Sequence, residues 1–136
     1  MRASVRRQIR LPLPAKRVWE LVGDPSRLPE WFDGIVSATV EGSSRTIVTG
    51  GGIAMPEQIV TNDSLQRRFQ YRITSPLMRE HLSTIDVIDL DDSTSLVSYS
   101  ADADPASMAL VIAGAAGAAL RNLCSVLEGN QMEPSA

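Results

Sequence analysis

The sequence predicts an α+β fold in which a curved antiparallel β-sheet wraps around a long C-terminal α-helix. An alternating pattern near the N-terminus is followed by two short helical patterns, then by about seventy strand-like residues from Ile35 onward, and finally by one long helical pattern. Antiparallel strands linked by short turns curl readily, and a long apolar helix can be buried on the concave side of such a sheet. The 136 residues suffice for one domain, expected over residues 1–130, with a disordered polar tail at 131–136.

The N-terminal third predicts one strand and two short helices. Residues 3–11 alternate between apolar and polar side chains, as in a half-buried strand, with Arg7 as the exception. Leu-Pro-Leu-Pro then ends the strand, because proline cannot donate a ladder hydrogen bond. Residues 14–23 form a helical pattern that ends at a glycine, and Asp-Pro at the start of 24–30 predicts the cap and first turn of a second helix.

Six further strands are expected in the middle of the chain. The clearest alternation places Phe69, Tyr71 and Ile73 on one side of their strand, with arginine and glutamine on the other. Gly-Ser-Ser, a run of three glycines, Asn-Asp-Ser and Asp-Asp-Ser-Thr supply turns between strands. The expected strands cover residues 35–41, 45–49, 55–61, 68–73, 81–90 and 95–102.

The last helix is expected to begin at Asp104 as N-cap, with Pro105 in the first helical position, and to stop at Gly129. Residues 105–120 carry no charge, but this run is shorter than the ~20 residues that span a bilayer, so no membrane span is predicted. An apolar stripe follows the helix through Ala109, Ile112, Ala113, Ala116, Leu120, Leu123 and Leu127.

Composition excludes several classes of function. A net charge of −3 and a pI of about 5.1 argue against general attraction to nucleic acid. The single cysteine, Cys124, excludes an internal disulfide and a cysteine metal site. The sequence contains no phosphate-binding glycine loop, metal-spaced His/Cys cluster or nucleophile elbow, so neither cofactor nor metal is expected. The N-terminus lacks the apolar run of a signal peptide, which makes a cytoplasmic location the expectation.

Three stretches resemble a known family. They are L-P-L-P-A-K-R-V-W-E-L-V-G-D-P-S-R-L-P-E-W-F, E-Q-I-V-T-N-D-S-L-Q-R-R-F-Q-Y-R-I-T, and the C-terminal Asp-Pro followed by R-N-L-C-S-V-L-E. Together they resemble the polyketide cyclase/dehydrase group of the START-like (SRPBCC, birch-pollen-allergen-like) superfamily, over about residues 3–129. The resemblance implies a helix-grip fold that encloses an apolar cavity, in which members bind lipids, sterols, hormones or polyketide intermediates and a minority catalyse cyclisation or aromatisation.

Two titratable residues are weak catalytic candidates. His81 is the only histidine, and acid–base catalysis would require it to point into the cavity, but a surface or edge position is favoured because its strand is ambiguous in phase. Glu57 shares its phase with Ile59 and is expected to face inward, where it could anchor a ligand hydroxyl or act as an acid or base. Pairing with an arginine, such as Arg7 or Arg68, is the favoured alternative for Glu57.

Further residues are candidates for contact with a ligand. Tyr71 and Tyr99 are in phase with inward apolar neighbours, and each offers a flat apolar ring with a hydroxyl that needs a partner when buried. Trp31 is expected to pack the short helices against the sheet rather than to touch ligand. Ile35, Ile47, Leu82 and Leu110 are expected in the core or the cavity wall. The complete ligand-binding set is Trp31, Glu57, Phe69, Tyr71, Tyr99, Ala113, Ala116, Gly117 and Leu120.

The small residues of the last helix leave three interpretations open. Gly114 and Gly117 each cost the helix up to about 1 kcal/mol relative to alanine, so helix propensity does not explain them. They could leave space for a ligand, which the family resemblance favours, allow tight packing, or form a helix dimer contact through Ala113 and Gly117. In the first case, leucine at Gly117 or Ala116 is expected to block ligand uptake.

These observations favour a protein that binds a hydrophobic or amphipathic small molecule in a helix-grip cavity. Two alternatives stay open: a polyketide cyclase or aromatase that uses His81, Glu57 or a tyrosine, and a regulatory or toxin-like interaction protein. Either a monomer or a homodimer is compatible with the sequence.

Overall fold

A computed structural model of the chain describes residues 1–132, with the side-chain surroundings described through residue 129. The elements in chain order are β1 (Ala3–Leu11), α1 (Ala15–Val22), the 3-10 helix η1 (Pro25–Glu30), β2 (Ile35–Glu41), β3 (Ser44–Thr49), β4 (Ala54–Asp63), β5 (Arg68–Ile73), β6 (Glu80–Asp89), β7 (Ser95–Asp104) and α2 (Ala106–Met132). This order of one strand, two short helices, six strands and one long helix confirms the arrangement predicted from the pattern of the sequence.

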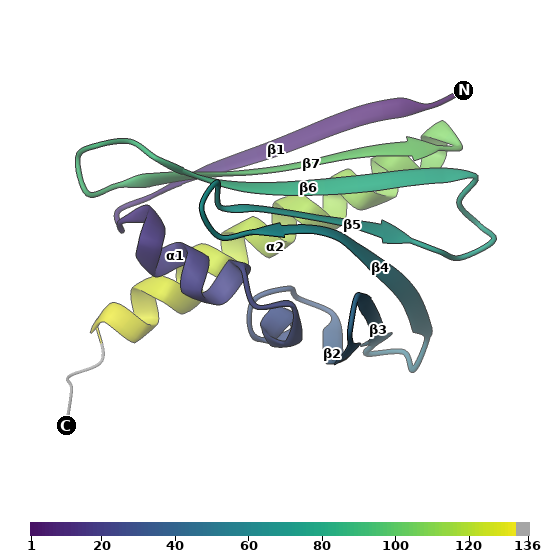
Figure 1. Cartoon of the computed structure of the whole chain (residues 1–136), viewed down its shortest axis with the longest axis horizontal. Helices are drawn as coiled ribbons and strands as arrows, with labels where there is room; N and C mark the ends of the chain where they lie inside the picture. The colour runs from purple at the N-terminus through teal and green to yellow at the C-terminus, as the bar shows by residue number, and fades with distance from the viewer. Residues whose placement is uncertain (133–136) are drawn as a thin grey trace.

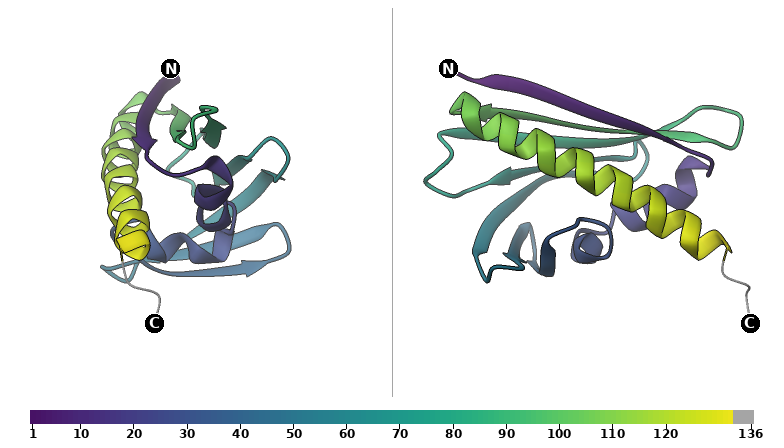
Figure 2. Two further views of the ribbon diagram at one scale, coloured as in Figure 1. Left: turned by 90° about the vertical axis from the view of Figure 1, so that its left-hand side faces the viewer. Right: turned by 180° about the vertical axis from the view of Figure 1, so that it is seen from behind.

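The seven strands form one antiparallel sheet in the order β1-β7-β6-β5-β4-β3-β2. Each strand from β2 to β6 pairs with the next one along the chain, and β1 pairs with β7. The sheet bends strongly, so that β2 and β3 curl away from the plane of β6 and β7 (Figures 1 and 2). Seen from behind, α2 crosses the concave side of the sheet diagonally (Figure 2). The predicted helix-grip fold is confirmed.

The two short helices start and end where the sequence predicts. Gly23 ends α1, and its amide donates to the Trp19 carbonyl. The Asp24 carboxylate then accepts from the Ser26 amide at 3.0 Å and so caps the next turn. This second segment is a 3-10 helix, and it contains Pro29, which has no amide hydrogen to extend an α-helical ladder.

The ends of α2 differ from the prediction. Asp104 is the last residue of β7 rather than the helix N-cap, and its carboxylate accepts from Arg79 at 2.8 Å. A cis peptide bond joins it to Pro105, and the helix begins at Ala106. At the other end the helix continues through Gly129 to Met132, because a glycine weakens a helix without necessarily stopping it. Residues 131 and 132 of the expected tail are therefore helical, and residues 133–136 lie outside the described part.

The long helix packs on only one part of the sheet. Its closest backbone neighbours are β1 and β7, and Ala109, Ala113 and Ala116 are buried along it. Leu110, expected to face inward, is 72% exposed, because one residue along a helix turns the side chain by about 100°. By length and composition residues 106–129 would suffice to cross a bilayer, but core helices share this property, and α2 here covers the sheet.

Gly117 lies where the long helix crosses an arginine of the edge strand. Arg7 pairs with Tyr99 across β1 and β7, so its side chain is on the concave face of the sheet. A Cβ placed on Gly117 would lie 3.8 Å from Cδ of Arg7, an ordinary contact distance. The helix thus packs against the Arg7 stem at this position, but a Cβ would fit there, so this packing does not require glycine.

Candidate functional site

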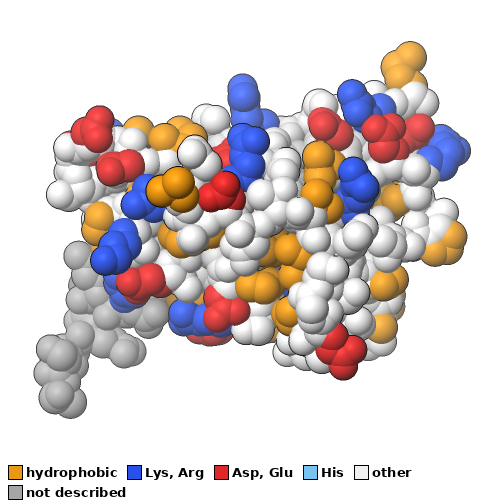
Figure 3. Space-filling model, in the orientation of Figure 1, with side chains coloured by type: hydrophobic (Ala, Val, Ile, Leu, Met, Phe, Trp, Pro, Cys, Tyr) orange, Lys and Arg blue, Asp and Glu red, His pale blue; other side chains and the backbone are white. Residues whose placement is uncertain are grey.

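An apolar cavity lies between α2 and the concave face of the sheet. Its volume is about 360 Å³, near the lower end of the ~300–1,000 Å³ typical of small-molecule sites. Residues from η1, β2–β5, β7 and α2 line it, most of them apolar; examples are Phe32, Ile35, Ile47, Met55, Val111 and Ile112. The cavity exists because α2 packs on β1 and β7 at one side of the curved sheet and stands off from the opposite side. Hydrophobic side chains also show among the backbone and polar atoms near the middle of the face in Figure 3, where acidic and basic side chains are interspersed.

Two tyrosines form a polar spot in the cavity wall. Tyr71 on β5 and Tyr99 on β7 both line the cavity, and their hydroxyl groups are hydrogen-bonded to each other. Burial raises the pKa of Tyr71, and it raises the pKa of Tyr99 well above its ordinary value. Both hydroxyls therefore keep their protons at neutral pH. The expectation that these residues face inward is confirmed.

Glu57 also lines the cavity, and it forms a buried ion pair with Arg45. Arg45 Nε donates to Glu57 Oε1 at 2.7 Å, and Arg45 Nη1 donates to the Pro25 carbonyl at 3.2 Å. The guanidinium carbon lies 5.0 Å from the centre of the Tyr71 ring. Burial raises the pKa of Glu57, and Arg45 opposes this by stabilising the carboxylate.

The predicted pairing of Glu57 with an arginine is confirmed, but its partner is neither of the two arginines named as examples. Arg45 lies directly opposite Glu57 in the β3–β4 register, with both side chains on the concave face. Arg68 instead pairs with Asp86 at 2.8 Å. The alternation along β3 places Arg45 on the same inward side as Ile47. This pattern does not show which residue of the neighbouring strand lies opposite Arg45.

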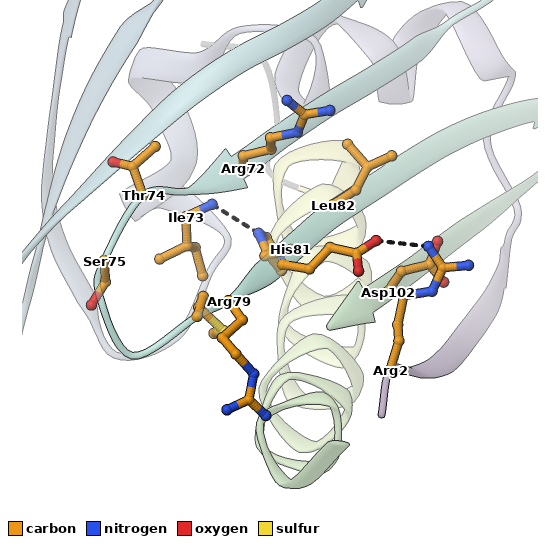
Figure 4. Close-up of a pocket in the computed structure, with 11 residues that line it drawn as sticks. Arg2, Arg72, Ile73, Thr74, Ser75, Arg79, His81, Leu82 and Asp102 are labelled. Atoms are coloured by element: carbon orange, nitrogen blue, oxygen red, sulfur yellow. Dashed lines mark hydrogen bonds and ion pairs between the residues drawn. The ribbon is translucent and has the colours of Figure 1, made fainter. Parts of the chain in front are cut away.

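His81 is buried, with 4% of its surface exposed, so the expectation of a surface or edge position is wrong. Its ring lies in the gap where β5 and β6 separate beyond the Tyr71–Ser83 pair (Figure 4). Nδ1 accepts from the Ile73 amide at 2.8 Å, and Nε2 lies 2.8 Å from Ser83 Oγ. The imidazole thus accepts the Ile73 amide hydrogen in place of a backbone carbonyl of the neighbouring strand. His81 does not line the cavity.

A second groove of about 510 Å³ lies mainly on the opposite side of the sheet, over the same gap between β5 and β6. His81 lines it, and it shares Ile73 and Met78 with the cavity. Polar side chains dominate its lining (Figure 4). Arg2 pairs with Glu80 at 2.8 Å, and Arg79 pairs with Asp104 at the same distance. Asp102 adds a further negative charge, and Arg72 adds a further positive one. Because opposite charges balance across the groove, it offers no concentrated field for a charged ligand.

Acid is expected to destabilise the protein through His81. Burial lowers the pKa of His81 to about 4, whereas the unfolded chain protonates near 6.5. Between these values the unfolded state binds more protons, so the His81 contribution is present above about pH 6.5 and is lost as the pH falls through 4. The difference amounts to up to about 3 kcal/mol. Urea unfolding at pH 7 and pH 4 should show a smaller loss for His81→Asn than for the wild type; equal losses would contradict this role.

Other residues of the predicted ligand-binding set do not line the cavity. Trp31 packs the short helices in the core, as expected, and its carbonyl accepts from Asn122 on α2 at 2.9 Å. Phe69 is buried next to Arg45, 5.3 Å from its guanidinium carbon. The helix residues of the set face β1 and β7 or the core rather than the cavity; they are Ala113, Ala116, Gly117 and Leu120. Leucine at Gly117 would meet Arg7 instead of closing the cavity, so the expected block of uptake does not follow from this geometry.

The predicted ligand-binding set lacks the residues that form the helical wall of the cavity. Met108, Val111, Ile112 and Ala115 provide the wall from α2, and Phe32 provides part of the opposite side. Phe32 follows Trp31 directly, and its ring lies 6.3 Å from that of Tyr99. Two adjacent aromatic residues after a short helix are a weak signal for a binding site, because the neighbouring sequence does not indicate which of the two rings points to a cavity.

Comparisons with known proteins agree with this architecture. The family model for polyketide cyclase / dehydrase and lipid transport proteins matches residues 2–128. An uncharacterised protein from Bacillus thuringiensis has a similar structure, with 25% identity, a TM-score of 0.85, and coverage of 93% of this chain and 99% of that one. The protein XoxI from Bacillus cereus has 23% identity, a TM-score of 0.88, and coverage of 96% and 99%.

A plant enzyme shares the fold at lower identity. Norcoclaurine synthase from Thalictrum flavum, solved in complex with dopamine and hydroxybenzaldehyde, is 13% identical with a TM-score of 0.71, and the match covers 100% of this chain and 90% of that one. No curated protein matches the sequence. Because the family model spans nearly the whole chain and the structure has the same helix-grip architecture, this protein belongs to the polyketide cyclase / dehydrase and lipid transport family.

Proposed function

We propose that this protein binds a hydrophobic or amphipathic small molecule in the cavity between α2 and the curved sheet. The observation that carries the proposal is a cavity of about 360 Å³ with mainly apolar walls and one polar spot, formed by Glu57, Tyr71 and Tyr99. Apolar burial contributes roughly 25 cal/mol per Å² of surface removed from water, so the walls would supply most of the affinity. The few polar groups would fix the orientation of the ligand.

Titration with naphthalene, followed by NMR of the backbone amides, tests this proposal. Naphthalene is an apolar probe of suitable size with no polar group. Saturable shifts are expected at cavity residues such as Ile35, Ile47 and Ile112, and none at Arg72 and Leu82 on the opposite groove. Absence of saturable shifts at the cavity, or shifts centred on the groove, would overturn the proposal. Native mass spectrometry of protein from its own host would then identify the ligand that copurifies.

One observation favours a second candidate function, acid–base catalysis on a bound ketone. The Glu57 carboxylate lines the same cavity as the two tyrosine hydroxyls, and burial raises its pKa towards neutrality. In such a reaction Glu57 would accept a proton from the carbon next to the carbonyl, while a tyrosine hydroxyl donates to the enolate oxygen. His81 has no place in this scheme, because its ring nitrogens are engaged with Ile73 and Ser83 outside the cavity wall.

Exchange of deuterium into 2-acetylnaphthalene distinguishes catalysis from binding. In D₂O, an active protein should replace the methyl protons of the ketone faster than buffer does, and the proton NMR signal of the methyl group should decay. Glu57→Gln should reduce the rate to that of buffer, while His81→Asn keeps it. A rate equal to that of buffer with the wild-type protein would leave binding as the function.

A further inference from the structure

We propose that the cavity selects ligands that carry an uncharged hydrogen-bond acceptor, such as a ketone oxygen, and that this oxygen binds at the Tyr71–Tyr99 hydroxyl pair. This inference rests on the proposed function and specifies its ligand class. It is drawn from a count of hydrogens at the buried Tyr71–Tyr99 pair, in which two hydroxyl groups share one hydrogen bond.

Beside the tyrosine pair lies His81, a histidine whose tautomer is fixed. The Ile73 amide donates to His81 Nδ1, so in the neutral imidazole the hydrogen is on Nε2. Nε2 therefore donates to Ser83 Oγ, which lies 2.8 Å away. The Ser83 oxygen thus accepts from His81, and Ser83 is the cross-strand neighbour of Tyr71.

Counting hydrogens then leaves one donor free. Tyr71 and Tyr99 have two hydroxyl hydrogens, and within the described residues the one hydrogen bond of either hydroxyl is the bond to the other tyrosine. If Tyr71 donates to Tyr99, the free hydrogen is on Tyr99; if Tyr99 donates to Tyr71, it is on Tyr71. Both residues line the cavity, so in either case the remaining O–H belongs to a residue of the cavity wall. A buried donor without an acceptor is costly, and a ligand oxygen would satisfy it.

The charges around the tyrosine pair favour a neutral group over a carboxylate. Arg45 and Glu57 balance each other at 2.7 Å, and of the two only the Glu57 carboxylate lines the cavity. An anionic head group would lie in the same poorly solvated space as this carboxylate, without a free cation beside it. A cationic head group cannot accept the tyrosine hydrogen at all. A carbonyl oxygen meets both conditions.

Three probes with the same naphthalene body test the inference: naphthalene, 2-acetylnaphthalene and 2-naphthoate at pH 7. The ketone should bind about tenfold more tightly than naphthalene, as expected for one satisfied buried hydrogen bond. The carboxylate should bind at least about tenfold more weakly than the ketone. The infrared carbonyl band of the bound ketone should lie below its frequency in cyclohexane, because hydrogen bonding weakens the C=O bond.

The double variant Tyr71→Phe/Tyr99→Phe removes the donor while keeping both rings. It should lose the preference for the ketone, and its bound carbonyl band should move to the cyclohexane position, while its affinity for naphthalene stays within about threefold. Each single variant, Tyr71→Phe or Tyr99→Phe, still has one free tyrosine O–H and should keep the preference. Retention of the preference in the double variant would overturn the inference.

The two proposals fail in different ways. If none of the probes shifts the cavity residues, the proposed function fails and this inference fails with it. If naphthalene binds but the ketone binds no better, or the carboxylate binds as tightly, only the present inference fails. The infrared band in the wild-type protein gives a test that does not depend on folding of the double variant: a band at the cyclohexane position would overturn the hydrogen bond.

Discussion

Replacing Ile112 by tryptophan is expected to weaken naphthalene binding by about a hundredfold. Ile112 is half-buried on α2 and lines the cavity, so a larger side chain at this position extends into the ligand space. An indole that removes on the order of 100 Å² of contact between ligand and wall costs about 2.5 kcal/mol, which is close to a hundredfold in affinity. The cavity of about 360 Å³ can accept the added atoms, so the free energy of unfolding should change little.

Leu110→Trp provides the matched control for this variant. It makes the same aliphatic-to-tryptophan change two residues away on the same helix, but Leu110 is exposed and does not line the cavity. The control should bind naphthalene as the wild type does, with both affinities measured by the NMR titration. Normal binding by Ile112→Trp would mean that the ligand occupies another site. Equal loss in both variants would indicate a general disturbance of the helix.

The fold could be predicted from the sequence because its patterns are local. Alternation identified Phe69, Tyr71 and Ile73 as one side of a strand, and all three face the concave side in the structure. Proline and glycine marked the ends of α1 and the start of η1. These signals depend on neighbours along the chain, and each one needs no knowledge of which strands pair.

The cavity face of α2 could not be predicted in the same way. Residues 108–120 are uncharged throughout, so no contrast between polar and apolar sides indicates how this half of the helix is rotated. The structure turns Ala113 and Ala116 towards the core side, and it turns Val111, Ile112 and Ala115 to the cavity. The packing of α2 on β7 and on β1, which is distant in sequence, fixes this rotation.

The surroundings of His81 and Glu57 depend on the register between strands. The strand of His81 has apolar residues on both sides, and the side that is buried in the structure is the one with Ser83, Ile85 and Val87. The end of pairing between β5 and β6 then creates the gap that the imidazole fills. For Glu57, the cross-strand partner Arg45 stabilises the charged carboxylate. The pattern of one strand contains no information on the residue opposite it.

Replacing Arg45 by methionine is expected to cause the largest loss of stability in this protein. Arg45 is 2% exposed, and its removal leaves the buried Glu57 carboxylate without a counter-charge. Breaking one side of a buried ion pair typically costs about 3–5 kcal/mol. The free energy of unfolding at pH 7, measured with guanidinium chloride, should fall by this amount.

The double variant Arg45→Met/Glu57→Leu separates the unpaired charge from the lost packing. Without either charge the cost of desolvation disappears, so its stability should return to within about 1 kcal/mol of the wild type or exceed it. Acid should likewise restore part of the stability that the single variant Arg45→Met loses. The pKa of Glu57, already raised by burial, rises further without Arg45, so lowering the pH from 7 to 5 protonates the buried carboxyl and narrows the deficit. A deficit that is small or independent of pH would mean that the Glu57 carboxylate is hydrated in solution rather than held in the interior by Arg45.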